Sequence, residues 1–183
     1  LIYTGPIVNT SLTRDDRRIF RNQTIGFMGG SQGSKQINNY VEKFMKSDHQ
    51  LNFNILHVTG KSKNTLEIDK KNYQSIEFIE DMDNFYKKID ILVGRAGGGS
   101  LEAAYLGIPQ ILIPYKHGTT SSHQELNAKH LEDKGWGIRV NTFDQLTSKI
   151  KNISKNITKK KLNLPNISIG NQTISKELYE QIN

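Results

Sequence analysis

The chain has 183 residues, of which 35% are hydrophobic, and a formal net charge of +7 from 25 Lys and Arg against 18 Asp and Glu. This length suits one domain or at most two small ones, and the absence of cysteine excludes disulfides and thiolate chemistry. The sequence has no run of about 18 apolar residues that would form a transmembrane helix. The positive charge favours an anionic partner, whether a phosphate ligand, a membrane surface or nucleic acid, but a lysine-rich composition without functional meaning explains it equally well.

Residues 1–23 are predicted to form a linker with a first extended segment, because Gly5-Pro6 marks a turn and the stretch after it is charged. The chain begins at Leu1 without a methionine, so we expect it to be a fragment of a longer protein. Residues 24–164 are predicted to form an α/β domain, and residues 165–183 a C-terminal helix.

The first convincing strand covers Thr24–Met28 and runs directly into a glycine-rich loop, GGSQGS at residues 29–34. A helix follows, with apolar residues at helical spacing: Ile37, Tyr40, Val41, Phe44 and Met45. A strand, a glycine loop and a helix N-terminus together favour phosphate binding, and the hydroxyl of Ser31 would add a donor. Because the loop matches neither the Walker A pattern nor GxGxxG, a simple βα turn is the alternative.

The middle of the chain continues the alternation, with strands at Phe53–Val58 and Ser75–Ile79 and a short helix at Asn84–Lys88. Asp81 and Asp83 form a DxD pair, which binds a metal in some enzymes. Acids in a first helical turn, where they complement the helix dipole, are the favoured explanation. The histidines lack the i, i+4 spacing of a helical zinc site, so no metal site is predicted.

The chain is organised around the stretch that follows. An apolar strand at Ile89–Val93 breaks into a glycine turn at Gly97–Gly99 and continues as a helix that carries Glu102. A second apolar strand at Gln110–Pro114 completes a βαβ unit of a parallel sheet. Ligands of such sheets bind beyond the carboxyl ends of the strands.

Two features of this stretch have chemical meaning. Three consecutive glycines let a ligand approach the backbone, and the helix N-terminus after them favours an anion such as phosphate. Glu102 would face the same crevice, where a carboxylate can hold the two hydroxyls of a ribose; an ordinary N-terminal acid is an equal alternative. Polar side chains suited to hydroxyl recognition follow the second strand: His117, Ser121, Ser122, His123, Gln124 and Asn127.

The last part of the chain is predicted to hold a helix with Leu126, His130 and Leu131 on one side, a strand at Trp136–Val140 and a helix at Phe143–Asn152. Residues 149–163 are basic and read as a solvated helix surface, with a membrane or nucleic-acid role as the weaker alternative. About six strands alternate with helices, which predicts a doubly wound, Rossmann-like parallel sheet.

Five motifs, in this order, closely resemble the MurG family: GGSQGS (29–34) with Ile37-Asn38, EFIEDM (77–82), RAGGGS-LE (95–102), LGIPQILIPY (106–115) and HQELNA (123–128). The resemblance implies the C-terminal, donor-binding half of a GT-B fold. It further implies an inverting hexosyltransferase that transfers GlcNAc from UDP-GlcNAc to a lipid-linked muropeptide, converting lipid I to lipid II in peptidoglycan synthesis.

The resemblance also implies roles for individual residues. The glycine loop would hold the diphosphate or reach the sugar, the backbone of Ile79 would read the uracil edge, and Glu102 would bind the ribose. The side-chain amides of Gln124 and Asn127, with His123 beside them, would bind the GlcNAc hydroxyls. The residues implied are Gly30, Ser31, Gln32, Gly33, Ile79, Gly97, Gly98, Glu102, His123, Gln124 and Asn127. Asn9 stands where the family usually has a phosphate-binding arginine, so Lys35 and Arg95 are the candidate replacements.

The resemblance implies a transfer without a metal or other cofactor. The catalytic residues are expected in an N-terminal domain that also binds the acceptor, so this chain should bind donor without catalysing transfer alone. The expected partners are UDP-GlcNAc, the lipid-linked acceptor and an anionic membrane surface, but not nucleic acid. The expected location is cytoplasmic, peripheral on the inner face of the cell membrane.

Two alternatives stay open. The first is a related GT-B enzyme that acts on diacylglycerol or another lipid-linked acceptor, and the second is a non-catalytic UDP-sugar-binding module. The glycine turn before Glu102 is one residue shorter than is usual in the family, and the loop from His117 to His123 is one residue longer. These differences bear on the sugar and the acceptor more than on UDP.

Overall fold

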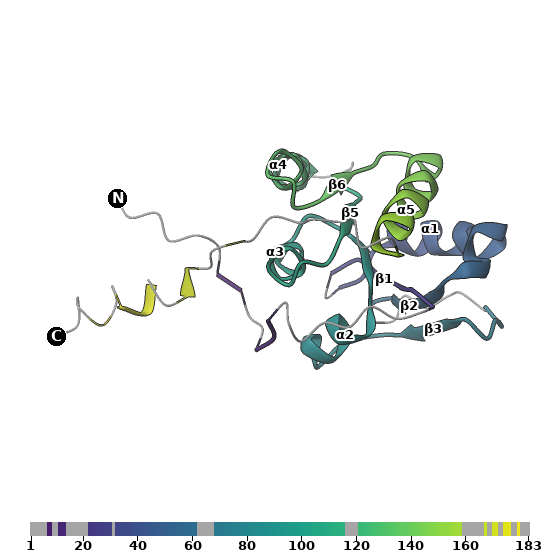
Figure 1. The fold of residues 1–183 in the computed structure, drawn as a ribbon, viewed down its shortest axis with the longest axis horizontal. Helices are drawn as coiled ribbons and strands as arrows, with labels where there is room; N and C mark the ends of the chain where they lie inside the picture. Colours follow the sequence, from purple (N-terminus) through teal and green to yellow (C-terminus); the bar gives the residue numbers. More distant parts are fainter. Residues whose placement is uncertain are drawn as a thin grey trace.

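The computed structural model describes residues 7–8, 11–13, 22–30, 32–61, 68–115, 121–158, 167, 170–171, 174–176 and 179. These residues contain a six-stranded parallel sheet with the order β3-β2-β1-β4-β5-β6 (Figure 1). Its strands are β1 (Thr24–Met28), β2 (Asn54–Val58), β3 (Tyr73–Ile76), β4 (Ile91–Gly94), β5 (Gln110–Leu112) and β6 (Ile138–Arg139). The helices are α1 (Lys35–Lys46), the 3₁₀ helix η2 (Asp48–Asn52), α2 (Met82–Lys88), α3 (Gly98–Tyr105), α4 (Ser121–Asp133) and α5 (Phe143–Thr158). The predicted doubly wound α/β fold is therefore confirmed.

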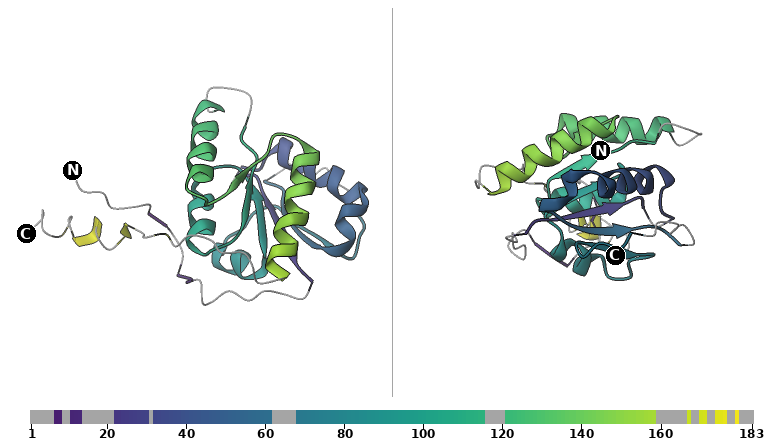
Figure 2. Two further views of the ribbon diagram at one scale, coloured as in Figure 1. Left: turned by 45° about the horizontal axis from the view of Figure 1, so that its top comes forward. Right: turned by 90° about the vertical axis from the view of Figure 1, so that its right-hand side faces the viewer.

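Helices cover both faces of the sheet (Figure 2). On one face, Ile91 and Val93 of β4 belong to the same apolar cluster as Phe44 of α1 and Ile150 of α5. On the other face, Leu92 clusters with residues of α2 and α3. Because successive strand residues point to opposite faces, a strand that is covered on both sides needs an unbroken apolar run, which the sequence of β4 provides.

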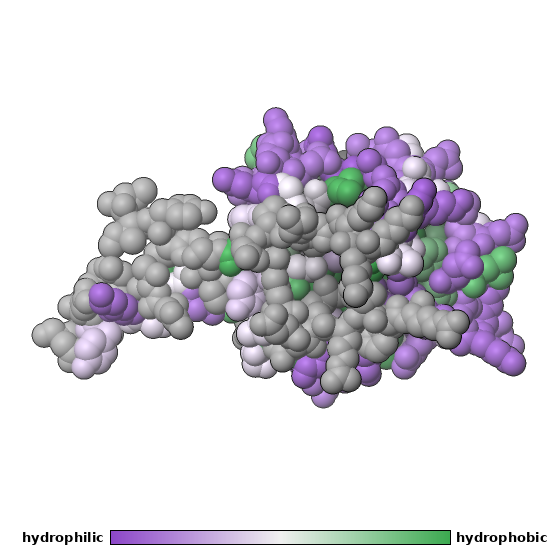
Figure 3. Space-filling view, viewed as in Figure 1, coloured by the Kyte–Doolittle hydropathy of each residue, from purple (hydrophilic) through white to green (hydrophobic). Residues whose placement is uncertain are grey.

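Local sequence explains where α1 begins and which side it buries. The hydroxyl of Ser34 caps the helix by accepting a hydrogen bond from the backbone N–H of Ile37 at 3.3 Å. Ile37, Val41 and Phe44 then repeat at helical spacing and are fully buried, as predicted. The outer surfaces of α1 and α5 are polar, and in Figure 3 hydrophilic residues dominate the described surface where these helices lie.

Glycine at position 26 allows α2 to pack closely on β1. A Cβ added to Gly26 would lie 2.8 Å from atoms of the Phe85 and Ile89 side chains, which is closer than real contacts allow. Any larger residue in this strand would push the end of α2 away from the sheet.

Several predicted boundaries were wrong. The third strand is Tyr73–Ile76 rather than Ser75–Ile79, because the chain leaves the sheet early to reach the N-terminus of α2. The helix α5 continues to Thr158 rather than ending at Asn152, because Ile153 and Ile157 extend its buried stripe. Residues 149–158 of the basic stretch thus belong to α5, and Lys151 and Lys155 are exposed on its outer side, as predicted for a solvated helix surface.

The side of α4 that packs on the domain also differs from the prediction. Leu126 is 65% exposed, whereas Ala128 and Leu131 are buried against Leu112 of β5. The helix begins at Ser121, so His123 and Gln124 lie in its first turns and not in the predicted loop.

Two contacts attach the N-terminal segment to the rest of the described chain. The side-chain amide of Asn171 donates a hydrogen bond to the carbonyl of Val8 at 2.8 Å and accepts one from its N–H at 3.1 Å. The backbone N–H of Ser11 donates to a carboxylate oxygen of Asp83 at 3.1 Å. No described helix is long and apolar enough to cross a membrane.

Candidate functional site

The candidate site lies at the point where the strand order reverses. The chain leaves β1 toward α1 on one face of the sheet and leaves β4 toward α3 on the other, although β1 and β4 are neighbours (Figure 1). The two connections diverge and leave a crevice beyond the carboxyl ends of these strands, which is where doubly wound sheets bind ligands. The two glycine-rich segments singled out in the sequence, residues 29–34 and 97–99, are the loops at this crevice.

One part of the crevice is an apolar hollow of about 450 Å³. It is lined by Met28, Gly30, Val58, Phe78, Ile79, Met82, Gly98, Gly99 and Glu102. Ile79 lies beyond the last paired residue of β3, Ile76, so its backbone stands outside the sheet ladder. The ring of Phe78 is 43% exposed, and the Lys61 ammonium lies 4.9 Å from its centre. Among the described residues that line this hollow, Glu102 carries the one carboxylate.

The other part is a polar hollow of about 490 Å³. It is lined by Gly29, Gly30, Gln32, Gly33, Ser34, Lys35, Gln36, Arg95 and Tyr115. Lys35 and Arg95 give it positive charge, and Gly30 lines both hollows, so the two adjoin. The apolar hollow with Glu102 in its wall and the adjoining hollow with two cations suit a ligand with an uncharged and an anionic end.

The glycine loop after β1 has a conformation that side chains disfavour. Gly30 and Gly33 have φ angles of +88° and +71°, and the N–H of Gly33 donates to the carbonyl of Gly30 at 2.9 Å. A Cβ on Gly33 would collide with the carbonyl of Thr59, so this loop packs directly on the loop after β2. Gly30 has open space where its side chain would be. Ser31, predicted to contact the diphosphate, lies outside the described residues.

The helix α3 presents its N-terminus to the crevice. Gly97 is the N-cap residue and has no side chain that could cap the helix. The positive end of the helix dipole therefore faces the crevice without a side-chain cap. A Cβ on Gly97 or Gly98 would meet no other atom within 4 Å. The space above this turn is therefore open, as the prediction of close ligand approach requires.

Glu102 lies one turn into α3 with its carboxylate at the apolar hollow. The hydroxyl of Tyr86, from α2, donates a hydrogen bond to Oε2 of Glu102 at 2.7 Å and lies 3.2 Å from the carbonyl of Gly99. Tyr86 is completely buried. Its phenol pKa is raised, mainly by this burial and secondly by the neighbouring Glu102 carboxylate. The phenol therefore keeps its proton and serves as a donor to the carboxylate.

Arg95 follows β4 and faces the glycine loop. Its Nη2 donates to the hydroxyl of Ser34 at 2.7 Å, and its guanidinium carbon lies 4.5 Å from the centre of the Tyr115 ring. Partial burial lowers the pKa of the Arg95 guanidinium, but arginine stays charged in proteins. These contacts fix a cation between the N-terminus of α1 and the loop after β5.

The residues predicted to bind the sugar lie beside the two hollows and not in their walls. Gln124 accepts a hydrogen bond from the backbone N–H of Tyr115 at 3.2 Å through Oε1, and the amide of Asn127 points to the carbonyl of Ala96 at 3.4 Å. His123 is exposed in the first turn of α4. The structure thus brings α4 against the loops after β4 and β5, at the cationic end of the crevice.

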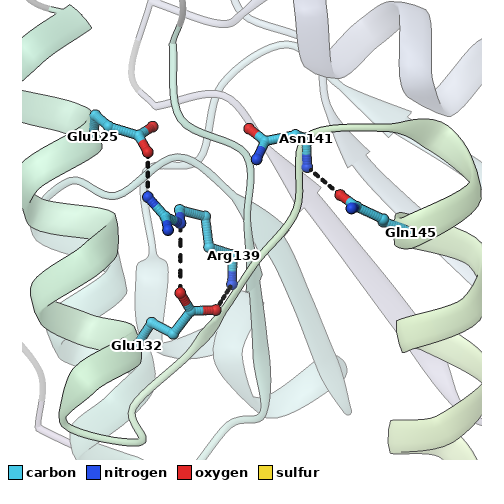
Figure 4. A network of polar contacts seen from close by, with 5 residues as sticks. All are labelled: Glu125, Glu132, Arg139, Asn141 and Gln145. Carbon is cyan, nitrogen blue, oxygen red and sulfur yellow. Dashed lines mark hydrogen bonds and ion pairs between the residues drawn. The ribbon is translucent and has the colours of Figure 1, made fainter.

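An ion-pair network holds α4 in this position (Figure 4). The guanidinium of Arg139, on β6, pairs with Glu125 and with Glu132, where the Nε to Oε2 distance is 3.4 Å. The backbone N–H of Arg139 also donates to Glu132 at 2.9 Å. Glu125 adjoins Gln124 in the sequence, so the network sets the rotation of the helix that carries the predicted sugar ligands.

A buried polar chain supports the loop after β2. The side-chain N–H of Asn38 donates to the carbonyl of Thr59 at 3.2 Å, so its Oδ1 accepts from Nε2 of His57 at 3.0 Å. Nδ1 of His57 then accepts from the hydroxyl of Tyr73 at 2.9 Å. Burial lowers the pKa of His57 to about 4, so the imidazole is neutral at pH 7.

The DxD pair has structural partners. The carboxylate of Asp81 caps α2 by accepting from the N–H of Asn84 at 3.0 Å, and Asp83 accepts hydrogen bonds from Ser11. Among the described residues, no three His, Cys, Asp or Glu side chains gather closely enough to hold a metal ion. Both acids thus lie at the start of a helix, as the favoured explanation of the pair predicted.

Sequence reasoning missed several residues at the crevice. Ser34, Tyr86 and Tyr115 were not singled out, because each looks like an ordinary helix, core or strand-end residue. Tyr86 in particular follows Phe85 in an apolar cluster, which predicts packing alone. A signal was present for Ser34, since a serine immediately before a helix is a preferred N-cap.

A divergent glycine-lined crevice of this kind at the switch point of a 3-2-1-4-5-6 sheet defines a Rossmann-like ligand-binding domain. The chain belongs to the family described as Glycosyltransferase family 28 C-terminal domain, whose model matches residues 24–182. This confirms the resemblance found in the sequence.

Individual relatives of the chain support the same family. The chain is 31% identical over 166 residues to UDP-N-acetylglucosamine--N-acetylmuramyl-(pentapeptide) pyrophosphoryl-undecaprenol N-acetylglucosamine transferase 3 of Bacillus cereus, covering 81% of this chain and 47% of the relative. It is 32% identical over 190 residues to the transferase of the same description from Rickettsia bellii, covering 87% of this chain and 53% of the relative. The chain thus spans about half the length of these relatives.

A solved structure gives the same picture in three dimensions. The crystal structure of Acinetobacter baumannii MurG is similar to this chain with a TM-score of 0.64 and 28% sequence identity, over 79% of this chain and 45% of that one.

Proposed function

We propose that this chain is the donor-binding half of an inverting glycosyltransferase that transfers GlcNAc from UDP-GlcNAc to a lipid-linked muropeptide in peptidoglycan synthesis. The observation that carries the proposal is the pairing of two adjoining hollows that share Gly30: an apolar one with Glu102 in its wall, and a polar one with Lys35 and Arg95 in its wall. Such a pair suits uracil and ribose in the first hollow and a diphosphate in the second. The names of the relatives support GlcNAc as the sugar and a pyrophosphoryl-undecaprenol compound as the acceptor.

The residues take the following roles. The backbone of Ile79 reads the uracil edge, Glu102 accepts from the ribose hydroxyls, and the glycine loop at Gly30–Gly33 holds the diphosphate. The turn at Gly97 and Gly98 lets the nucleotide approach the N-terminus of α3. Arg95, and Lys35 at the start of α1, supply the positive charge that the family's arginine would give at position 9.

The sugar extends from the cationic end of the crevice toward α4, where Gln124 and Asn127 receive its hydroxyls with His123 at their side. An amide side chain both donates and accepts, which suits a sugar hydroxyl. The side-chain carbonyl of Gln124 already accepts a hydrogen bond from the N–H of Tyr115. Its N–H₂ group is therefore the donor for the sugar.

Transfer is a single displacement. The acceptor hydroxyl oxygen attacks the anomeric carbon from the face opposite the diphosphate, and the bond to the β-phosphate oxygen breaks with its electron pair leaving on UDP. Helix N-termini and the two cations stabilise the departing diphosphate, and no metal is required. The proton of the acceptor goes to a base in the half of the relatives' length that this chain does not span, so this chain alone binds donor without catalysing transfer.

The place of action follows from the acceptor. A lipid-linked acceptor puts the enzyme at the cytoplasmic face of the cell membrane as a peripheral protein. The net charge of +7 favours attraction to an anionic membrane surface.

Calorimetric titration of this chain with UDP-GlcNAc, UDP-glucose, UDP-galactose and UDP tests the proposal, each with magnesium and with a chelator. Tightest binding of UDP-GlcNAc, equal in both conditions, is expected. Preference for UDP-glucose or UDP-galactose would favour a glycolipid synthase instead, and binding only with magnesium would contradict the metal-free mechanism.

A further inference from the structure

The Tyr86 side chain reaches the predicted ribose ligand, Glu102, from outside the crevice. It is completely buried in the cluster formed by α2, α3 and the sheet, and it does not line either hollow. Its ring packs edge-on against Phe85 with the centres 5.8 Å apart. A phenylalanine would fill the same space without the cost of burying a hydroxyl. The hydroxyl therefore needs an explanation other than packing.

The contacts of the hydroxyl all lie on the first turns of α3. It is 2.7 Å from Oε2 of Glu102 and 3.2 Å from the carbonyl of Gly99. A hydroxyl has one proton, and the shorter, charge-assisted bond to the carboxylate is the stronger of the two. The fit to the glycine turn is close, because a Cβ on Gly99 would lie 3.2 Å from the same hydroxyl.

A free glutamate side chain has three rotatable bonds, and a ligand that orders them loses affinity. A donor already bonded to one carboxylate oxygen fixes the side chain before the ligand arrives. Glu102 also lines the apolar hollow, and a carboxylate has two oxygens with several lone pairs that can accept from ribose hydroxyls.

We propose that Tyr86 is a positioning residue of the ribose site, holding the Glu102 carboxylate in the orientation that accepts the two ribose hydroxyls. The inference rests on the proposed function, because it takes Glu102 as the ribose ligand. It adds a residue on a different element, so that α2 and α3 must both be in place for the nucleotide to bind tightly.

Titration of the wild-type chain and of Tyr86→Phe with UDP and with 2′,3′-dideoxyuridine diphosphate tests the inference. Tyr86→Phe should weaken UDP binding about tenfold, the usual effect of losing one hydrogen bond to a charged group. Binding of the dideoxy compound should change less than about twofold, because it lacks the hydroxyls that Glu102 accepts. In a Glu102→Ala background, Tyr86→Phe should likewise weaken UDP binding by less than about twofold.

Tyr40→Phe is the matched control. The Tyr40 hydroxyl donates to the carbonyl of Asn141 at 3.3 Å, away from both hollows, so neither ligand should respond. Thermal unfolding of Tyr86→Phe sets a titration temperature at which the variant is folded.

The outcomes separate the two proposals. If the wild-type chain binds no uridine nucleotide, the proposed function fails and this inference fails with it. If the wild-type chain prefers UDP to the dideoxy compound but Tyr86→Phe loses the same factor for both, Tyr86 has a structural role alone and only this inference is overturned. An undiminished effect of Tyr86→Phe in the Glu102→Ala background would overturn it as well.

Discussion

Glu102 is the residue whose removal tests the crevice most directly, since among the described residues it is the one carboxylate in the wall of either hollow. We expect Glu102→Ala to weaken UDP binding by about 1–3 kcal/mol, the usual range for losing a charged hydrogen-bonding partner. Glu42→Ala is the control, because Glu42 pairs with Lys46 on the outer side of α1. Calorimetric titration with UDP measures both variants, and an unchanged affinity for Glu102→Ala would remove this residue from the site.

Gln124 distinguishes the sugar from the nucleotide. Gln124→Ala should weaken UDP-GlcNAc binding by about 1 kcal/mol while leaving UDP binding nearly intact, because the amide donor meets the sugar alone. Gln124→Glu is the matched variant: it keeps an acceptor for the N–H of Tyr115 but has no amide donor. If Gln124→Ala weakens both ligands equally and Gln124→Glu weakens neither, Gln124 only holds the loop that carries Tyr115.

Single residues differ in how well the sequence predicted them. The positions of Glu102 and of the glycines at the crevice were predictable, because a glycine turn and the first helical turn after a strand lie at the carboxyl edge of a parallel sheet. Tyr86 was not predictable, because the sequence cannot say whether a tyrosine in an apolar helix buries its hydroxyl or points it at a partner. For Gln124, the sequence predicted a sugar ligand but not the hydrogen bond that its side chain accepts from Tyr115.

At the scale of elements, the loops after β1 and β2 support each other, and His57 lies beneath them. Burial holds the pKa of His57 at about 4, below the unfolded value of about 6.5. A lowered folded pKa means that the stabilisation is fully present above pH 6.5 and is lost as the pH falls toward 4. The unfolded state takes up the proton first, so acid favours unfolding.

We expect the unfolding free energy of the wild-type chain and of His57→Gln to depend differently on pH. From pH 7.5 to pH 4.5 the wild-type free energy of unfolding should fall by about 2 kcal/mol more than that of His57→Gln, in which the amide has no charge to gain. Glutamine can donate to Asn38 and accept from Tyr73, so the chain of hydrogen bonds is kept. Urea unfolding at the two pH values measures this, and equal falls in both proteins would show that His57 does not titrate in this way.

Element boundaries were harder to predict than element types. The strand after β2 was placed too late because Phe78 and Ile79 extend the apolar run, yet both line the hollow instead of the sheet. Similarly, Leu126 was assigned to the buried side of α4, whereas the ion pairs of Arg139 with Glu125 and Glu132 set the helix rotation. Long-range contacts decide both cases, and a local pattern does not contain them.

At the scale of the whole molecule, the alternation of strands and helices predicted a doubly wound parallel sheet, and the strand order of the structure determines where the crevice lies. The two halves of the sheet, β3-β2-β1 and β4-β5-β6, meet only at the pairing of β1 with β4. The proposed ligand contacts both halves, since the glycine loop follows β1 and Glu102 follows β4. Bound UDP-GlcNAc should therefore stabilise the whole chain against unfolding.

The size of this effect follows from mass action. At a concentration of UDP-GlcNAc about 100 times its Kd, the folded state gains about 2.7 kcal/mol, which for a domain of this size raises the Tm by about 5–10 °C. Glu102→Ala at the same ligand concentration should show a smaller rise, and Glu42→Ala the full one. Thermal unfolding followed by circular dichroism measures all three. A rise that Glu102→Ala leaves unchanged would mean that the ligand stabilises the chain from another place, and the crevice would then no longer be the donor site.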